Sequence, residues 1–229
     1  MTLAAQLASM IMRSGLPETL PRDPMPLLRA WFDQAMSDKH VPNPDAIALG
    51  SVSAQGRPAV RVVLAKRIID APPAVVFFTN YASRKAQELD ATGVAAGVFN
   101  WDHHTRQARV EGVVSRASTA DSDAYFANRP LLSRIGAWAS RQSQPISSRT
   151  ELIDAVLTQM KRFGVGLTDL MGESSKPFDI PRPEFWGGYV LSIEAVELWC
   201  AGGGRMHDRA RWAYDRSANA WTGATRQLP

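Results

Sequence analysis

Apolar positions recur along the chain in two periods, one helical and one extended. Near the N-terminus large apolar residues return every three or four positions, which predicts an amphipathic helix over residues 23–39 (Leu28, Trp31, Phe32, Met36). Short runs rich in β-branched and aromatic residues follow, separated by Gly, Pro and Asn. These runs predict strands at 46–52, 59–68 and 74–79.

The second half of the chain repeats the extended pattern. It predicts a hairpin of residues 93–101 and 105–116, two strands at 188–192 and 194–200, and a terminal hairpin of 211–214 and 220–226. Helices are predicted after three serines that can cap a first turn, Ser83, Ser118 and Ser148.

Residues 164–183 are rich in Gly, Pro and Ser and indicate a long loop. We expect a flexible N-terminal arm at residues 1–22. Residues 23–229 then form a single domain, mainly antiparallel β (β+α), with a barrel or sandwich and peripheral helices.

Composition narrows the class of protein. The chain has 229 residues, 45% of them hydrophobic, which is enough for a substantial core. Its net charge of +4 is spread out, favouring a small anionic ligand over nucleic acid. Cys200 is the only cysteine, so an internal disulfide is excluded. The apolar N-terminus is interrupted by Arg13 and predicts neither a secretory signal nor a membrane span, so we expect a cytoplasmic protein.

An arginine-rich stretch at residues 129–149 is the strongest chemical signal. Its sequence, RPLLSRIGAWASRQSQPISSR, has four arginines and no acidic residue. Guanidinium groups beside Ser and Gln indicate an anion site, and phosphate fits best because guanidinium binds it bidentately. A basic surface loop is the alternative. Further basic clusters are RVVLAK (61–66), Ser83–Lys85 and RMHDR (205–209).

Several common kinds of functional site are not predicted by the sequence. The chain has neither a dinucleotide-binding G-x-G-x-x-G after a strand nor a Walker loop. His103 and His104 would point to opposite sides of a strand, so no metal site is predicted. His207 is either an ordinary histidine or one that faces a ligand. Cys200 is expected to be a buried apolar group, and Trp186 either belongs to the core or packs on an aromatic ligand.

Seven motifs in order give the chain a family resemblance. They are RVVLAK (61–66), FFTNYASRKAQEL (77–89), RQARVEG (106–112), AYFANRP (124–130), SRIGAWASRQSQPISSR (133–149), FWGGY (185–189) and RMHDR (205–209). Over residues 24–215 the chain resembles the pyridoxamine 5′-phosphate oxidase family. The resemblance implies an FMN-binding split β-barrel, and a homodimer with FMN at the subunit interface.

The resemblance also implies roles for matching residues. The FMN-binding set would be Arg61, Val62, Lys66, Phe78, Thr79, Arg84, Lys85, Gln107, Gln142, Ser143, Trp186 and Arg209. The substrate would meet Lys66, Tyr125, Arg129, Ser133, Arg205 and His207. Of these, Arg205 and His207 would be the catalytic pair that positions the reacting carbon.

The implied activity is oxidation of pyridoxamine or pyridoxine 5′-phosphate to pyridoxal 5′-phosphate. Dioxygen would be the acceptor, with release of hydrogen peroxide and, from the amine, ammonia. The arm lacks a basic and tyrosine-containing segment, and Cys200-Ala201 replaces a Gln-Gly-like pair. Two alternatives therefore stay open. One is a related FMN-dependent oxidase of another aromatic substrate, such as a phenazine precursor, and the other is a non-catalytic flavin- or pyridoxal-phosphate-binding protein.

Overall fold

An antiparallel β-sheet forms the body of the protein in the computed structural model, which describes residues 2–3, 6, 15–171 and 177–229. Within these residues the strands form one eight-stranded sheet in the order β3-β2-β1-β4-β5-β6-β7-β8. The strands are β1 (Ala46–Val52), β2 (Pro58–Ile69), β3 (Ala74–Asn80), β4 (Val94–Trp101), β5 (Arg106–Arg116), β6 (Trp186–Cys200), β7 (Asp208–Asp215) and β8 (Ala220–Gln227).

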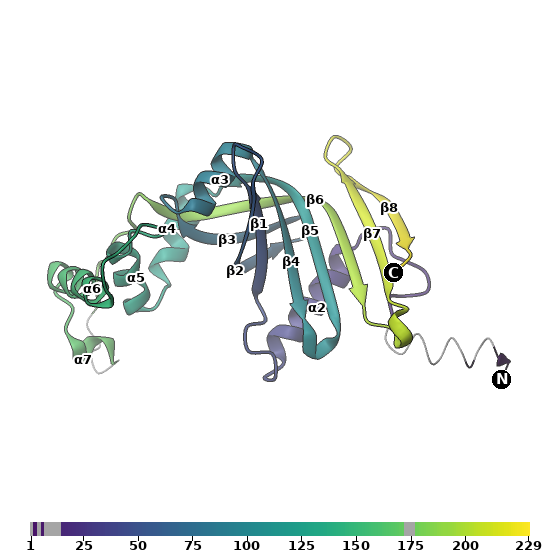
Figure 1. Ribbon diagram of the computed structural model, residues 1–229, viewed down its shortest axis with the longest axis horizontal. Helices are drawn as coiled ribbons and strands as arrows, with labels where there is room; N and C mark the ends of the chain where they lie inside the picture. Colours follow the sequence, from purple (N-terminus) through teal and green to yellow (C-terminus); the bar gives the residue numbers. More distant parts are fainter. Residues whose placement is uncertain (1, 4–5, 7–14, 172–176) are drawn as a thin grey trace.

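Strand β6 belongs to two parts of this sheet. Its first half pairs with β3, with Thr79 opposite Gly187, and this pairing closes the sheet from β3 to β6 into a barrel. Its second half pairs with β7, which carries β8 as an outer edge (Figure 1). The prediction of a mainly antiparallel split barrel with peripheral helices is confirmed. The two strands expected at 188–192 and 194–200 are a single strand.

One extra residue interrupts the pairing of β5 with β6. Ile193 lies opposite Gly112 and Ala195 lies opposite Glu111, so Glu194 has no partner and forms a bulge. A side chain at Gly112 would place its Cβ 2.0 Å from the Ser192 carbonyl oxygen, so only glycine fits there. The core side chains of β6 are Tyr189, Leu191 and Ile193 before the bulge and Val196, Leu198 and Cys200 after it.

Helices occupy two places around the barrel. Helix α2 (Met25–Ser37) buries Leu28, Trp31 and Phe32 in the main core as predicted, whereas Met36 of the same predicted face is 51% exposed. Helix α3 (Arg84–Thr92) is capped by Ser83, whose hydroxyl accepts from the Ala86 N–H, as predicted. A helical group lies at one side of the barrel (Figure 1): α4 (Thr119–Ala127), α5 (Leu131–Ala139), α6 (Arg149–Phe163) and α7 (Leu167–Leu170).

The helical group has its own apolar core, built around Phe126, Ile135, Met160 and Trp186. Ser118 and Ser148 cap α4 and α6 as predicted. Helix α5 lies inside the arginine-rich stretch, where no helix was expected. The helix has only nine residues, LLSRIGAWA, so its apolar positions span little more than two turns. Helix α7 lies in the segment expected to be a long loop, of which residues 172–176 are outside the described residues.

Residues 15–22 run along the outer hairpin of β7 and β8. The Leu16 N–H donates to Asp208 Oδ2 at 2.7 Å, and the indole N–H of Trp212 donates to the Pro21 carbonyl at 2.8 Å. Residues 1, 4–5 and 7–14 of the expected arm lie outside the described residues, so its flexibility stays a prediction. None of the described helices is long and apolar enough to cross a membrane.

Candidate functional site

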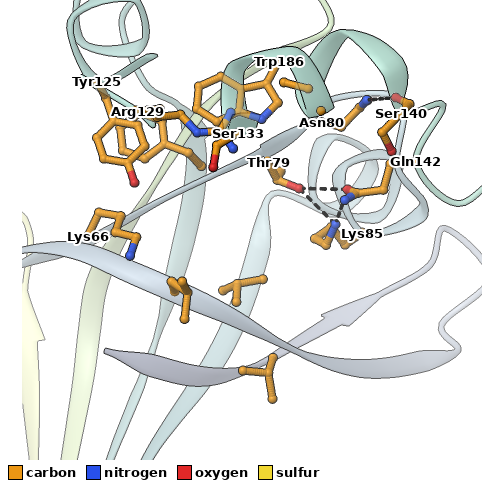
Figure 2. Close-up of a pocket in the computed structure, with 16 residues that line it drawn as sticks. Lys66, Thr79, Asn80, Lys85, Tyr125, Arg129, Ser133, Ser140, Gln142 and Trp186 are labelled. Carbon is orange, nitrogen blue, oxygen red and sulfur yellow. Dashed lines mark hydrogen bonds between the residues drawn. The ribbon is translucent and has the colours of Figure 1, made fainter. Parts of the chain in front are cut away.

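A cavity of about 460 Å³ lies between the barrel and the helical group. Strands β2, β3 and β6 form one side, and helices α4 and α5 with the segment after α5 form the other (Figure 2). Ten residues that the family resemblance assigns to FMN or substrate line it: Val62, Lys66, Phe78, Thr79, Lys85, Tyr125, Arg129, Ser133, Gln142 and Trp186. The cavity therefore gathers most of the predicted site from segments far apart in sequence.

Lys85 forms one cationic end of the cavity. Its Nζ donates to Thr79 Oγ1 at 2.9 Å, to Gln142 Oε1 at 2.8 Å and to Ser83 Oγ at 3.2 Å. Burial, with the nearby charge of Arg61, lowers the pKa of Lys85 to about 8. Over the described parts of the chain, no carboxylate pairs with this ammonium group. A lysine held in a cavity by neutral acceptors is suited to binding an anion.

Arg129 forms a second cationic end, beside Tyr125 and Ser133 (Figure 2). Its guanidinium lies over the Trp186 ring, 4.5 Å from the ring centre. The Nη1 atom is buried and has no hydrogen-bond partner among the described residues, and burial lowers the pKa of the group. An unpaired buried guanidinium donor is costly, so it indicates a missing acceptor such as phosphate or carboxylate.

Stacked aromatic rings lie near the Arg129 end. Phe78 stacks on Tyr125 at 3.9 Å between ring centres and on Trp186 at 5.7 Å. Lys66, on β2 across the cavity from Tyr125, is neutralised by Asp45 because its Nζ lies 2.6 Å from Asp45 Oδ2. The cavity thus offers flat aromatic surfaces near one end and, at its two ends, cations that have no carboxylate partner among the described residues.

Arg61 and Arg84 lie outside the cavity lining. Both guanidiniums bind Glu88, with Arg61 Nη2 at 2.9 Å from Oε2 and Arg84 Nε at 2.7 Å from Oε1. Burial alone would raise the pKa of Glu88, but hydrogen bonds from Ser51, Arg84 and Arg61 outweigh it and hold that pKa below its usual value. Ser143 is near this group, since its hydroxyl accepts from the Arg84 N–H at 3.3 Å. The predicted contacts of these residues with a cofactor stay a prediction.

The remaining predicted residues lie at the opposite end of β6. Trp199 of β6 lies opposite Gln107 of β5 on one side and opposite Arg209 of β7 on the other. The His207 ring lies 4.6 Å from the Trp199 ring, and its Nδ1 accepts from the Gly202 N–H at 3.3 Å. Arg205 lies in the short helix η2 (Gly203–Arg205) with a left-handed φ of 64°.

Strand geometry keeps this second group away from the cavity of the same chain. Trp186 lines the cavity and Trp199 contacts His207, and these two residues lie roughly 40 Å apart along an extended strand. Arg209 is held locally, with its Nη2 2.8 Å from Glu197 Oε2. One chain therefore brings together the ten residues of the cavity but not Gln107, Arg205, His207 and Arg209.

Several polar residues of the site were missed at the sequence level. Asn80 donates to the Ser140 carbonyl at 3.1 Å, and both residues line the cavity. Glu88 could have been found, because it follows Arg84 by four positions on a helix. Asp45 lies in a loop before β1, and no local pattern links it to Lys66.

One expectation about histidine was wrong. His103 and His104 lie in η1 (Asp102–His104), a single helical turn between β4 and β5, and not in a strand. Both rings approach the same carboxylate, Asp38, at 3.7 and 3.2 Å. Cys200 is buried as expected, and burial raises the pKa of its thiol to about 11.

Comparison with known proteins agrees with this arrangement. Residues 33–159 match a family model described as pyridoxamine 5′-phosphate oxidase, and residues 186–225 match a pyridoxine 5′-phosphate oxidase C-terminal dimerisation region. The pyridoxine/pyridoxamine 5′-phosphate oxidase of Ruegeria sp. is 43% identical over 87% of this chain and 92% of its own length. That of Bordetella pertussis is 42% identical over 90% of this chain and 89% of its own.

A solved structure is also similar. PhzG from Burkholderia lata, in complex with tetrahydrophenazine-1-carboxylic acid, superposes with a TM-score of 0.77 at 29% identity, covering 91% of this chain and 94% of PhzG. The family model and the two relatives decide the assignment. This chain belongs to the pyridoxamine 5′-phosphate oxidase family.

Proposed function

We propose that this protein is an FMN-dependent oxidase that converts pyridoxamine or pyridoxine 5′-phosphate to pyridoxal 5′-phosphate with dioxygen. One observation carries the proposal. The cavity has a cation at each end, Lys85 and Arg129, for which the described part of the chain offers no carboxylate partner, and stacked aromatic rings lie near Arg129. A phosphorylated flavin beside a phosphorylated pyridine would match two such ends.

The Lys85 end suits the cofactor. Thr79, Lys85 and Gln142 already form one hydrogen-bonded group there, which offers the cavity both hydrogen-bond donors and acceptors. Such a mixed set can hold FMN through its phosphate and its ring edge. Bound FMN would supply the redox chemistry, taking a hydride from the substrate carbon and being reoxidised by dioxygen with formation of hydrogen peroxide.

The Arg129 end suits the substrate phosphate. The Nη1 atom of Arg129, which has no hydrogen-bond partner among the described residues, and the Ser133 hydroxyl can both donate hydrogen bonds to a phosphate monoester. Lys66 keeps further N–H donors beyond its bond to Asp45. The nearby Tyr125 and Trp186 rings offer surfaces for a planar ring.

A second copy of the chain would complete the site. The surface of β2 next to the cavity carries exposed apolar side chains, with Val60 72% and Val62 66% exposed in the single chain. Such a patch is typical of an interface. The region that matches a dimerisation model holds β7 and Arg205, so a two-fold partner can bring its Arg205 and His207 to this cavity.

The protein's own residues would position the substrate against the flavin. In neutral His207, Nδ1 accepts a hydrogen bond from Gly202, so Nε2 carries the proton and can donate to a polar substrate group. Arg205, whose carbonyl accepts from the His207 N–H at 3.0 Å, has an exposed side chain with no partner in the described structure. Together they would hold the donor carbon near the flavin and favour its reactive orientation.

A second candidate is an oxidase of a phenazine precursor. The similarity to PhzG bound to a tetrahydrophenazine carboxylic acid favours it. Arg129 could then bind a carboxylate in place of a phosphate. A non-catalytic flavin- or pyridoxal-phosphate-binding protein is the third candidate, and it needs no positioned Arg205 and His207.

One experiment separates these candidates. The purified protein is examined by visible spectroscopy and then given pyridoxamine or pyridoxine 5′-phosphate in air, while aldehyde and peroxide are followed. We expect a yellow protein that forms both products. A colourless protein that takes up no added FMN would contradict every flavin candidate. A yellow protein that oxidises only the phenazine precursor supports the second candidate, and one inert to all substrates supports the third.

A further inference from the structure

Three of the chain's four histidines gather around a single carboxylate, far in sequence from the residues of the cavity. Asp38 ends α2, and His40 follows it by two residues. His103 and His104 come from η1, the turn between β4 and β5. Packing of α2 against the barrel thus brings two loop segments together at one point on the surface.

The ligand atoms already lie at the spacing that a metal ion requires. His40 Nδ1 is 2.9 Å from Asp38 Oδ1, and His103 Nε2 is 3.7 Å from Asp38 Oδ2. Ligand atoms of these three residues all lie within 4.8 Å of one another. Tetrahedral zinc with bonds of about 2.0–2.1 Å places its ligand atoms roughly 3.3 Å apart, so small side-chain rotations suffice.

The fourth side chain supports a ligand role for the carboxylate. His104 Nε2 lies 3.2 Å from Asp38 Oδ2. That nitrogen is buried and, within the described residues, makes no well-aligned hydrogen bond. Carboxylates that bind a metal are themselves usually held by a hydrogen-bond donor, a role that this imidazole can fill.

We propose that Asp38, His40 and His103 form a binding site for a divalent transition-metal ion such as Zn²⁺, with His104 orienting Asp38. Two imidazoles and one carboxylate favour zinc or a similar ion over Mg²⁺ and Ca²⁺, which prefer oxygen ligands. Because His40 and His103 are 78% and 55% exposed, water would occupy the open coordination positions. The ion would join the end of α2 to the β4–β5 turn.

Equilibrium dialysis of the untagged, flavin-loaded protein against micromolar Zn²⁺ with excess Mg²⁺ tests the proposal. Elemental analysis should find about one zinc per chain. His40→Ala and His103→Ala should each lose the zinc. His207→Ala, which changes the one histidine outside the cluster, should keep it. Both substituted side chains are exposed, so the variants are expected to fold, and circular dichroism checks this.

Thermal unfolding gives an independent test of zinc binding. Zinc should raise the melting temperature of the wild-type protein and leave that of the double variant His40→Ala/His103→Ala unchanged, because a ligand stabilises only the state that binds it. Absence of stoichiometric zinc in the wild-type protein would overturn the proposal. Equal zinc uptake by the double variant would overturn it as well, as would loss of zinc only in His207→Ala.

Discussion

Glu88 is a buried carboxylate whose removal should weaken the fold measurably. Its side chain is 5% exposed and accepts hydrogen bonds from Ser51 Oγ at 2.5 Å, Arg61 Nη2 at 2.9 Å and Arg84 Nε at 2.7 Å. Glu88→Ala removes all three bonds and leaves the guanidinium of Arg61 without its counter-charge. We expect the free energy of unfolding to fall by about 3 kcal/mol.

The magnitude follows from the exposure of the two arginines. Arg84 is 66% exposed, so its ion pair contributes less than about 1 kcal/mol. Arg61 is 21% exposed, and breaking a buried pair of this kind costs about 3–5 kcal/mol. The lower end applies, because Arg61 keeps hydrogen bonds to Ser51 and to the Leu49 carbonyl. This loss is a large fraction of the stability of a typical domain.

Urea unfolding of the flavin-free protein, followed by tryptophan fluorescence, measures the effect. Arg84→Ala is the matched control and should cost less than about 1 kcal/mol. Arg61→Ala combined with Glu88→Ala should cost clearly less than the sum of the single changes, since both remove the same pair. A loss below about 1 kcal/mol for Glu88→Ala, or strict additivity of the two changes, would refute the reasoning.

The same carboxylate gives a pH dependence with a definite sign. Its pKa is depressed in the folded protein, so its stabilising effect is present above the unfolded value of about 4.3 and is lost as pH falls through the folded value. Glu88→Gln should therefore be less stable than the wild-type protein at pH 7, and the difference should shrink in acid. A constant or growing difference down to pH of about 3 would contradict this.

Three further predictions concern the cavity. Arg129→Met should raise the KM for pyridoxamine phosphate by roughly 10- to 100-fold, the effect of one charge-assisted hydrogen bond, whereas Arg141→Ala, in the same stretch but exposed, should leave steady-state kinetics unchanged. Because the pKa of Lys85 is lowered to about 8, it loses its charge as pH rises through that value. FMN affinity, measured by fluorescence quenching, should be weaker at about pH 9 than at about pH 7, and Lys85→Met should lack the change. Arg205→Ala should reduce kcat strongly with FMN still bound, and loss of FMN instead would place Arg205 at the cofactor.

Local patterns in the sequence predicted most of the elements. Strand β1 and the serine caps of α3, α4 and α6 follow from side chains adjacent in sequence, so they could be located without the structure. Helix α5 was not predicted, although Leu131, Ile135 and Trp138 recur at helical spacing, because a run of only nine residues gives a short period to detect.

The motifs named candidate residues of the cavity but not their arrangement. They pointed to Lys85 and Arg129, yet only the fold shows that, among the described residues, these cations lack carboxylate partners while Lys66 has one in Asp45. The separation of His207 from the cavity also depends on the path of β6. Both the ion-pair partners of the cations and the distance of His207 from the cavity depend on contacts between residues far apart in sequence. Such contacts leave no pattern among neighbouring residues, so the sequence alone could not predict them.

The bulge at Glu194 has a consequence for how this protein can change. In a regular strand, residues an odd number of positions apart face opposite ways. Trp186 and Trp199 would do so, but the extra residue resets the alternation, and both lie off the main-core set of β6 side chains. Deleting Glu194 would keep the register on both sides of it, with Ile193 opposite Gly112 and Ala195 opposite Glu111, so Leu198 would stay inward and Trp199 outward. The bulge thus lets β6 lose one residue without reversing which of its side chains face the core.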